Sequence, residues 1–362
     1  MENRKIWIKA NGNEDIATGH IRRCMTIADE LIRRGMDVEF ILADDDSAHV
    51  LRVLSDQDNT VFNARILHTD YSKPEEEFEI FSEFFKEEAP DFFLIDSYYA
   101  TREYFAGLKE LIARSGRNIK LGLIDDFGKN DYPVDLIVNY DISGVKDIYS
   151  ARVKLLGEQY APIRPAFSKI DYQVRPRARR VFLSTGGTDP NLVIKNILTE
   201  IYEGDSPCRK VLDVTGLECE VIVGTFFEED YRRELEALSD RHKEITLHEQ
   251  VTNMPELMSS CDYAVSAGGA TLYELCAVGV PTVAFSMADN QVDFAIGFDK
   301  LGAAKYAGDA RKDHRLVQKI VTWGTAAVDN LGFRKRMSDK ARSIIDGKGT
   351  EKIVDAIVGL LV

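Results

Sequence analysis

The sequence has 362 residues, of which 44% are hydrophobic and 29% are charged, and its formal net charge is −14 at pH 7. This composition excludes a disordered chain, and no apolar run reaches the roughly 18 residues that a membrane-spanning helix needs. The negative charge argues against a protein that coats nucleic acid. The length is typical of two domains, and the start of the sequence lacks the apolar core of a signal peptide. We therefore expect a cytoplasmic monomer with no nucleic-acid partner and no membrane insertion.

The cysteine pattern predicts free thiols. The five cysteines are scattered, none forms a C-x-x-C pair, and no group of Cys and His has the spacing of a zinc site. They are Cys24, Cys208, Cys219, Cys261 and Cys276. We expect reduced cysteines, no metal and no cofactor.

Short apolar runs alternate with helical stretches through the first half of the sequence. Residues 21–32, after the first run, place apolar side chains on one face at helical spacing, and Gly35 stands where a helix often ends. Runs this short between helices predict a parallel sheet covered on both faces. The predicted strands of this half are Ile6–Lys9, Val38–Leu42, Phe92–Asp96, Leu121–Asp125 and Leu136–Asn139.

The composition changes over residues 161–180, which contain three prolines and several basic residues, so we place a linker there. The alternation then restarts. Its predicted strands are Val181–Ser184, Val221–Val223, Ile245–Leu247, Tyr263–Val265 and Thr282–Phe285. We therefore predict an α/β fold of two Rossmann-like domains, residues 1–165 and 178–362, with the last helix a candidate to pack back on the first domain.

The strongest local signal is the segment Val265–Glu274, with the sequence VSAGGATLYE. A strand ends, small residues turn the chain, and a helix begins near Thr271. Glycines let a phosphate approach the backbone, and the N–H groups at a helix start attract an anion. Glu274, one turn into that helix, can accept hydrogen bonds from a ribose diol. Taken alone, the segment is equally compatible with a plain strand–helix turn.

A wider pattern favours a nucleotide. The run S-x-G-G-A-T-x-x-E-x-x-x-x-G-x-P, followed by D-N-Q, resembles the nucleotide-sugar motif of the N-acetylglucosaminyltransferase that completes the lipid-linked peptidoglycan precursor. The resemblance implies that Glu274 holds the ribose and that Gln291 lies near the sugar, with Asn290 in the same motif. The residues that it implies for the diphosphate are Gly268, Gly269, Ala270 and Thr271.

Two further segments fit the same superfamily. Residues 247–258 resemble the segment whose backbone reads uracil, with Val251 at that position. Residues 186–189, Gly-Gly-Thr-Asp, resemble a glycine loop that faces the diphosphate, which makes Gly187 and Thr188 nucleotide-binding candidates. A glycine turn after a strand also occurs with no ligand, so this loop alone does not distinguish a nucleotide-binding loop from a structural turn.

A histidine in the first domain is the candidate catalytic group. In the segment Ala17–Cys24, Gly19 precedes His20 and a helix begins there. The positive end of a helix favours a neutral imidazole, which can accept a proton from water. We expect His20 to face the cleft between the domains, with Gly19 as a substrate contact. The alternative is a histidine at a helix start with no chemical role.

An ordered set of motifs resembles the UDP-sugar hydrolases of pseudaminic acid biosynthesis, which have the glycosyltransferase-B fold. The matching pieces are A-x-G-H-x-x-R-C at 17–24, D-x-Y at 96–98, the paired acids at 125–126, D-x-x-x-N at 135–139, the segment 157–167, and G-G-T-D at 186–189. The resemblance implies hydrolysis of UDP-2,4-diacetamido-2,4,6-trideoxy-β-L-altropyranose to UDP and the free sugar. It makes His20 the base for water and places Tyr98 near the sugar. Direct attack by water predicts inversion at the anomeric carbon.

Other functions remain compatible with these residues. A glycosyltransferase with a UDP-sugar donor has the same nucleotide half, and a related hydrolase can act on another nucleotide sugar for a surface or spore polysaccharide. A binder without catalysis is the third alternative. The acidic run Asp44–Asp46 looks like the metal-binding motif of other glycosyltransferases, but we expect a solvent loop there. The adjacent acids Asp125 and Asp126 point to opposite faces of a strand and are expected to order a loop or cap a helix.

Overall fold

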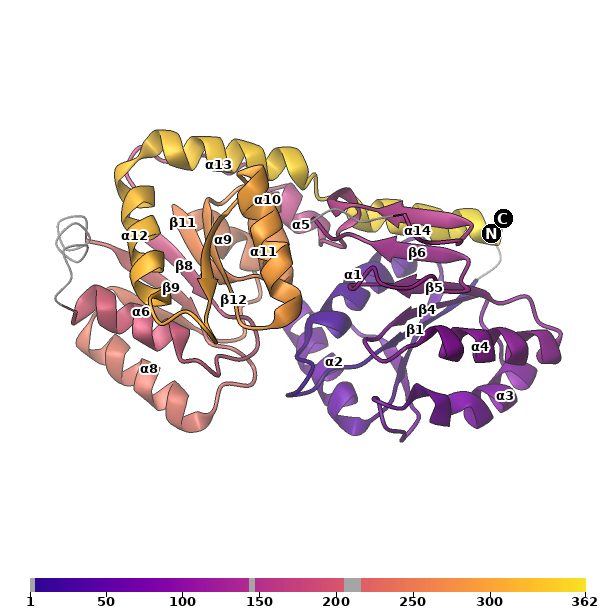
Figure 1. Ribbon diagram of the computed structural model, residues 1–362. Coiled ribbons are helices and arrows are strands. Elements are labelled where there is room, and N and C mark those ends of the chain that lie inside the picture. Colours follow the sequence, from indigo (N-terminus) through magenta and orange to yellow (C-terminus); the bar gives the residue numbers. More distant parts are fainter. Residues whose placement is uncertain (1–3, 143–146, 205–215) are drawn as a thin grey trace. The chain divides into compact units, whose positions relative to one another are not determined.

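The computed structural model describes residues 4–142, 147–204 and 216–362, which form two compact units (Figure 1). The first unit runs to Arg164 and takes up the chain again over Lys348–Val362. The second unit is Pro165–Gly347. Among the described residues, no helix combines the length and the apolar character needed to cross a membrane.

A seven-stranded parallel sheet forms the centre of the first unit. Its order is β3-β2-β1-β4-β5-β6-β7, and every residue of the inner strands β4 and β6 is buried. Such strands are apolar on both faces because helices cover both sides of the sheet. The strands are β1 (Lys5–Ala10), β2 (Asp37–Leu42), β3 (Asn63–Ile66), β4 (Phe92–Asp96), β5 (Lys120–Ile124), β6 (Leu136–Asn139) and β7 (Val153–Leu156).

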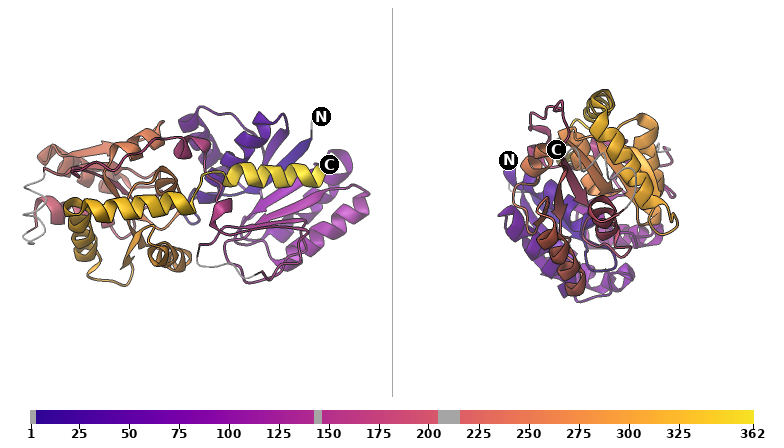
Figure 2. Two further views of the ribbon diagram at one scale, coloured as in Figure 1. Left: turned by 90° about the horizontal axis from the view of Figure 1, so that it is seen from above. Right: turned by 90° about the vertical axis from the view of Figure 1, so that its left-hand side faces the viewer.

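The helices of the first unit include one from the far end of the sequence. Helix α14 packs on α1 and β6, and the Thr350 hydroxyl donates to the Ile163 carbonyl at 2.8 Å. Figure 2 shows this helix in yellow along the first unit. The helical elements are α1 (Gly19–Arg33), α2 (Asp45–Asp58), η1 (Pro74–Glu77), α3 (Phe78–Glu87), α4 (Arg102–Ser115), η2 (Glu158–Tyr160) and α14 (Gly349–Leu361).

The second unit repeats this design with a six-stranded parallel sheet, in the order β10-β9-β8-β11-β12-β13. Its strands are β8 (Arg180–Ser184), β9 (Glu218–Ile222), β10 (Ile245–His248), β11 (Tyr263–Ala267), β12 (Thr282–Ser286) and β13 (Lys305–Asp309). Its helices are α5 (Pro165–Ser168), α6 (Val193–Tyr202), α8 (Glu229–Arg241), α9 (Met254–Ser260), α10 (Ala270–Val278), α11 (Asp289–Leu301), α12 (Leu316–Asp329) and α13 (Leu331–Ile344).

Of residues 161–180, where the sequence places the linker, residues 165–180 lie in the second unit. Tyr172 is 1% exposed, and its hydroxyl donates to the carbonyls of Cys261 and Asp262 at 3.2 and 3.3 Å. Arg175 forms an ion pair with Asp262 at 3.1 Å. This segment therefore packs against the sheet, and α14 belongs with the first unit. The domain boundaries 1–165 and 178–362 remain a prediction of which parts of the chain fold independently.

The structure also adds three strands that the sequence analysis does not predict, β3, β7 and β13. Each lies at the edge of its sheet and is partly exposed. Their sequences contain Asn, Arg, Lys and Asp, so they lack the apolar run that marks an inner strand. The predicted fold class, α/β with two Rossmann-like domains, is confirmed.

Four cysteines are free thiols buried in the two cores, Cys24, Cys219, Cys261 and Cys276. Burial raises the pKa of each of these thiols above its ordinary value. They are therefore protonated at neutral pH and behave as small apolar side chains. Cys208 lies outside the described residues.

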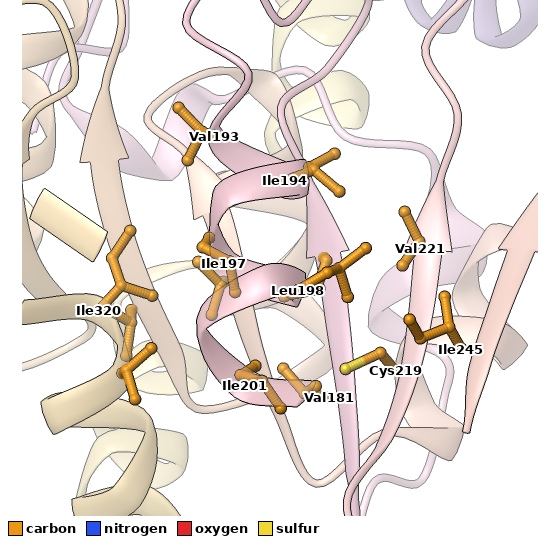
Figure 3. Packing of buried hydrophobic residues seen from close by; sticks show 14 of the residues in the cluster. Val181, Val193, Ile194, Ile197, Leu198, Ile201, Cys219, Val221, Ile245 and Ile320 are labelled. Atoms are coloured by element: carbon orange, nitrogen blue, oxygen red, sulfur yellow. The ribbon is translucent and has the colours of Figure 1, made fainter. Parts of the chain in front are cut away.

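Helix α6 shows how the second core is built (Figure 3). Its apolar face, at helical spacing, packs on the strands β8 and β9 of the sheet beneath it. Leu198 lies at the middle of this face and is fully buried. Removing its branched end leaves a cavity that the surrounding side chains fill only in part.

We expect Leu198→Ala to lower the free energy of unfolding by about 2–5 kcal/mol, measured by urea denaturation. The matched control is Leu301→Ala, the same change at a side chain that is 39% exposed. That control should cost under about 0.5 kcal/mol. Equal losses for the two variants would contradict the packing described for α6.

Candidate active site

In both sheets the strand order reverses at one point. The reversal lies between β1 and β4 in the first unit and between β8 and β11 in the second. Chains leaving such neighbouring strands go to opposite faces of the sheet, and ligands of doubly wound folds bind at the carboxyl ends of the strands there. His20 follows β1 and Tyr98 follows β4, while Gly187 follows β8 and Gly268 follows β11. Most predicted site residues therefore lie at the two switch points.

The loop before α1 is fixed by its own polar side chains. The Asn13 side chain accepts hydrogen bonds from the backbone N–H groups of Asp15 and Ile16 at 3.0 Å each. Ala17 has a φ of 57°, which turns the chain into the helix. Gly19 is the first residue of α1, and an added Cβ there would meet nothing within 4 Å. The loop thus holds the first turn of α1 in place and leaves open space beside Gly19.

His20 lies in this first turn and is only 3% exposed. Its Nδ1 is 2.9 Å from the Asp96 carboxylate and 3.2 Å from the Asp96 carbonyl oxygen. Its Nε2 is buried and has no hydrogen-bond partner in the part of the chain that the structure describes. An Nδ1–H that donates to Asp96 leaves the lone pair of Nε2 as a proton acceptor. The histidine is thereby oriented for general-base chemistry.

Arg23 follows one turn later on α1 and is only 9% exposed. Its guanidinium donates to both carboxylate oxygens of Asp96, to both oxygens of Asp126 at 2.8 and 2.9 Å, and to the Tyr140 hydroxyl. Burial alone would raise the pKa of Asp96, but the charge of Arg23 and the hydrogen bonds from Arg23 and His20 outweigh it and lower that pKa. Asp96 is therefore ionised where it holds the imidazole.

The adjacent acids after β5 have different partners, as expected for side chains on opposite faces of a strand end. Asp125 orders the following loop, because it accepts from the N–H groups of Phe127 and Gly128 at 2.9 and 3.2 Å. It also accepts from the Tyr149 hydroxyl at 2.7 Å. Asp126 instead pairs with the guanidinium behind His20. Only Asp126 belongs to the candidate site.

Tyr98 packs edge-on against the His20 ring, with 4.2 Å between the ring centroids. Burial, and then the negative charge of Asp126, raise the pKa of its hydroxyl. A small pocket of about 10 Å³ lies here, which is roughly the room that one water molecule needs. It is lined by Asn11, Ile16, His20, Tyr71, Asp96, Ser97, Tyr98 and Tyr99. Tyr71 and Tyr99 are not among the predicted residues, because no pattern links two positions so far apart in the sequence.

The second unit places the glycine turn at the start of α10. The Gly268 N–H donates to the Phe285 carbonyl at 2.7 Å, and an added Cβ at Gly268 would lie 3.2 Å from the Gln291 carbonyl oxygen. Gly269 is the N-cap residue, and no side chain among the described residues caps the helix. An added Cβ at Gly269 would meet nothing within 4 Å. The first N–H groups of α10, at Ala270 and Thr271, are therefore available to an anion. 

Glu274 is half-buried on α10, five positions after the N-cap. The start of α11 packs against the same turn. There the Gln291 side-chain oxygen accepts from the Met287 N–H at 2.9 Å, and Asn290 is exposed. Glu274, Gly268 and Gln291 thus lie around one turn, as the resemblance implies. Val251 lies apart from them after β10, the edge strand of the sheet.

The glycine loop after β8 is held by contacts from two sides. Gly186 has a φ of 86°, which favours glycine, and the Gly187 carbonyl accepts from the Phe226 N–H at 2.9 Å. A Cβ at Gly224 would lie 2.6 Å from the carbonyl oxygens of Gly186 and Gly187, so only glycine fits there. Thr188 is half-buried in this loop. The loop is therefore a preformed backbone surface at the second switch point.

Other acids have structural roles. Asp189 accepts from the first N–H groups of α6, at Val193 and Ile194 (2.8 and 3.0 Å), and burial raises its pKa. Asp44 caps α2 by accepting from the Ser47 N–H at 2.7 Å, which accounts for the first acid of the run 44–46. Within the described ranges, no three His, Cys, Asp or Glu side chains are grouped as a metal site.

Arg23 neutralises the buried carboxylate of Asp96 and the half-buried one of Asp126, which predicts a pH-dependent penalty for its loss. We expect Arg23→Gln to lower the free energy of unfolding by about 3–5 kcal/mol at pH 8. In the variant, burial raises the pKa of Asp96 above its unfolded value, so the carboxyl binds a proton on mild acidification and part of the penalty disappears. The penalty should therefore be smaller at pH 5 than at pH 8.

Chemical denaturation at the two pH values measures this difference. The control is Arg33→Gln, the same change on the same helix at a side chain that is 68% exposed. It should cost under about 1 kcal/mol at either pH. A penalty for Arg23→Gln that is small, or that grows on acidification, would contradict the proposed charge balance.

No protein-family model matches the chain. A relative by sequence is the spore coat polysaccharide biosynthesis protein SpsG of Bacillus subtilis (strain 168). It is 24% identical over 364 residues, which cover 96% of this chain and 96% of the relative. This relationship spans both units.

Two solved structures give the same picture of the fold. The calicheamicin glycosyltransferase CalG4 matches with a TM-score of 0.64 at 13% identity, over 100% of this chain and 99% of that chain. Staphylococcus aureus MnaA, solved with UDP, matches with a TM-score of 0.63 at 14% identity, over 99% of this chain and 98% of that chain. The predicted glycosyltransferase-B fold is confirmed by these matches.

Proposed function

We propose that this chain is a nucleotide-sugar enzyme that transfers a sugar from UDP to an acceptor oxygen during the biosynthesis of a surface polysaccharide. The observation that carries the proposal is the buried His20–Asp96 pair, in which Nδ1 is held at 2.9 Å and Nε2 has no partner among the described residues. The name of the Bacillus subtilis relative supports the polysaccharide, the glycosyltransferase match supports the transfer, and the MnaA–UDP structure supports the nucleotide.

The second unit supplies the groups for the nucleotide. The diphosphate binds the N–H groups of the turn, because the start of α10 is uncapped and open at Gly269. The Glu274 carboxylate accepts hydrogen bonds from the ribose hydroxyls. Gly187 and Thr188 complete the diphosphate contacts from the neighbouring strand. Val251, Asn290 and Gln291 are the proposed contacts for uracil and sugar.

The first unit supplies the base. Nε2 of His20 takes the proton from the acceptor O–H while the oxygen attacks the anomeric carbon, and the bond from that carbon to the diphosphate oxygen breaks. UDP leaves with the electron pair, and the sugar inverts at this carbon. Asp96, ionised beside Arg23, stabilises the imidazolium that forms. A positioned base contributes typically 10²–10⁴-fold to the rate.

Water is the second candidate for the acceptor. The observation in its favour is the pocket beside His20, whose volume of about 10 Å³ is roughly that of one water site. The motif resemblance points the same way and names UDP-2,4-diacetamido-2,4,6-trideoxy-β-L-altropyranose as the substrate. In that case the enzyme is an inverting UDP-sugar hydrolase, and Tyr98 and Gly19 contact the sugar.

The experiment that tests the function is incubation with this UDP-sugar and with UDP-N-acetylglucosamine in ¹⁸O-labelled water, with and without a saccharide acceptor. Release of UDP only when the acceptor is present, with an unlabelled glycoside, supports transfer. Release of unlabelled UDP and free sugar without an acceptor supports hydrolysis at the anomeric carbon, because the phosphate oxygens of UDP do not exchange with water, whereas the anomeric oxygen of a free sugar does. Label in UDP, or no release of UDP under any condition, contradicts both.

We expect His20→Ala to lower kcat by about 10²–10⁴-fold and to leave the dissociation constant for UDP unchanged. The reason is that His20 contacts only first-unit residues among its described partners. Steady-state kinetics and calorimetry with UDP measure the two quantities separately. A His20→Ala variant that loses affinity for UDP would contradict this division of labour.

We expect Glu274→Ala to weaken UDP binding by about 1–3 kcal/mol, because the ribose hydroxyls lose their acceptor. Gly269→Ala is the companion variant: its Cβ meets no protein atom within 4 Å, so the fold should be unaffected while the diphosphate is obstructed. Calorimetry and a thermal melt test both variants. Full UDP affinity in Gly269→Ala would remove this turn from the phosphate site.

A further inference from the structure

A larger pocket lies at the other end of the first sheet, away from His20. Its volume is about 550 Å³. Apart from the α14 residues, those that line it stand just before β1, β4, β5 and β7 or, as Lys120 does, at the first position of a strand, so they lie at the amino ends of these strands. The last turn of α14, with Gly359 and Leu360, closes one side. His20 and Asp96 lie at the carboxyl ends, so this pocket is separate from the candidate active site.

The charge of this pocket is opposite to that of the chain. Among the described residues, four cationic side chains line it, against one carboxylate, Asp91, although the chain carries a net charge of −14. The cationic residues are Arg4, Arg117, Lys120 and Arg152. The pocket is therefore a local positive site on an acidic protein.

Two of the four cations already have partners in the protein. Arg4 pairs with Asp91 at 2.8 Å and donates to the Leu361 carbonyl at 3.2 Å, which fixes its guanidinium at the rim. Arg117 donates to the Lys86 carbonyl at 2.8 Å. The side chains of Lys120 and Arg152 make no ion pair or hydrogen bond with any residue inside the described ranges. Their charges are available to a ligand.

We propose that this pocket binds a small phosphorylated anion, such as a sugar phosphate or a nucleotide. Its volume lies in the range of small-molecule sites, about 300–1,000 Å³. Arginine and lysine together suit phosphoryl oxygens, since the guanidinium fork donates two parallel hydrogen bonds and the ammonium adds a point charge. The lining comes from four strand ends around a hollow, a shape that fits a compact ligand better than a flat membrane.

The probe for this proposal is inorganic pyrophosphate, titrated by calorimetry at low salt into the Gly269→Ala variant. That variant obstructs the phosphate turn of the second unit and leaves the pocket open, whereas UDP would itself compete for a phosphate pocket. We expect Lys120→Ala and Arg152→Ala each to weaken pyrophosphate binding about tenfold, the loss of one charge-assisted hydrogen bond. The matched control is Lys109→Ala, an exposed cation on α4 outside the pocket, which should leave binding unchanged.

The other outcomes would overturn the proposal. Pyrophosphate that fails to bind the Gly269→Ala protein, or that binds equally when Lys120, Arg152 or Lys109 is also replaced by alanine, removes the pocket as its site. Citrate that binds more tightly than pyrophosphate, with the same dependence on Lys120 and Arg152, makes it a carboxylate site. Cosedimentation with phosphatidylglycerol vesicles that needs these two residues, without pyrophosphate binding, makes it a membrane contact. Because UDP binding is measured separately, failure here leaves the proposed function untouched.

Discussion

The guanidinium of Arg23 is the charge on which the candidate catalytic centre depends. Two carboxylates, Asp96 and Asp126, reach this guanidinium from the ends of two strands, and the buried Asp96 would not stay ionised there without a cation. Because Arg23 shares helix α1 with His20, the same helix carries the base and the counter-charge of the acid that orients it. The contacts that orient His20 are therefore also contacts that hold the first switch point together.

How well the sequence predicts a feature of this structure depends on how far apart in the sequence the residues that form it stand. Inner strands such as Phe92–Asp96 are visible because both faces are buried and the run is apolar. The edge strand β13 is missed because solvent reaches it and its residues are mixed. The turns at Gly186 and Gly268 can be predicted because each has two adjacent glycines shortly after a predicted strand.

Contacts between distant segments are a different case. Arg23 pairs with Asp126, which stands 103 positions later in the sequence, and no pattern near either residue predicts the pair. Tyr71 and Tyr99 likewise become neighbours of His20 only through the order of the strands. Gly224 is required by the carbonyls of Gly186 and Gly187, another partner far along the chain. Local patterns therefore predict the candidate groups, and the fold supplies the residues that position them.

In the proposed mechanism, the choice between an alcohol and water as acceptor does not change the base. Either O–H can give its proton to Nε2 of His20, so selectivity between them has to come from what else fills the space beside the imidazole. Tyr98 covers one edge of the ring and leaves room on the scale of a single water. A larger acceptor requires this pocket to widen, which places the specificity in the tyrosines rather than in the histidine.

The return of α14 to the first unit has a consequence for biosynthesis on the ribosome. The core of that unit includes α14 side chains such as Ile353 and Ile357, which are fully buried. These residues are translated only after the whole of the second unit. The first unit therefore completes its fold last, although its strands are made first, and the surface of α1 and β6 that α14 covers stays uncovered until then. Apolar surface that stays exposed during synthesis favours aggregation and the binding of chaperones.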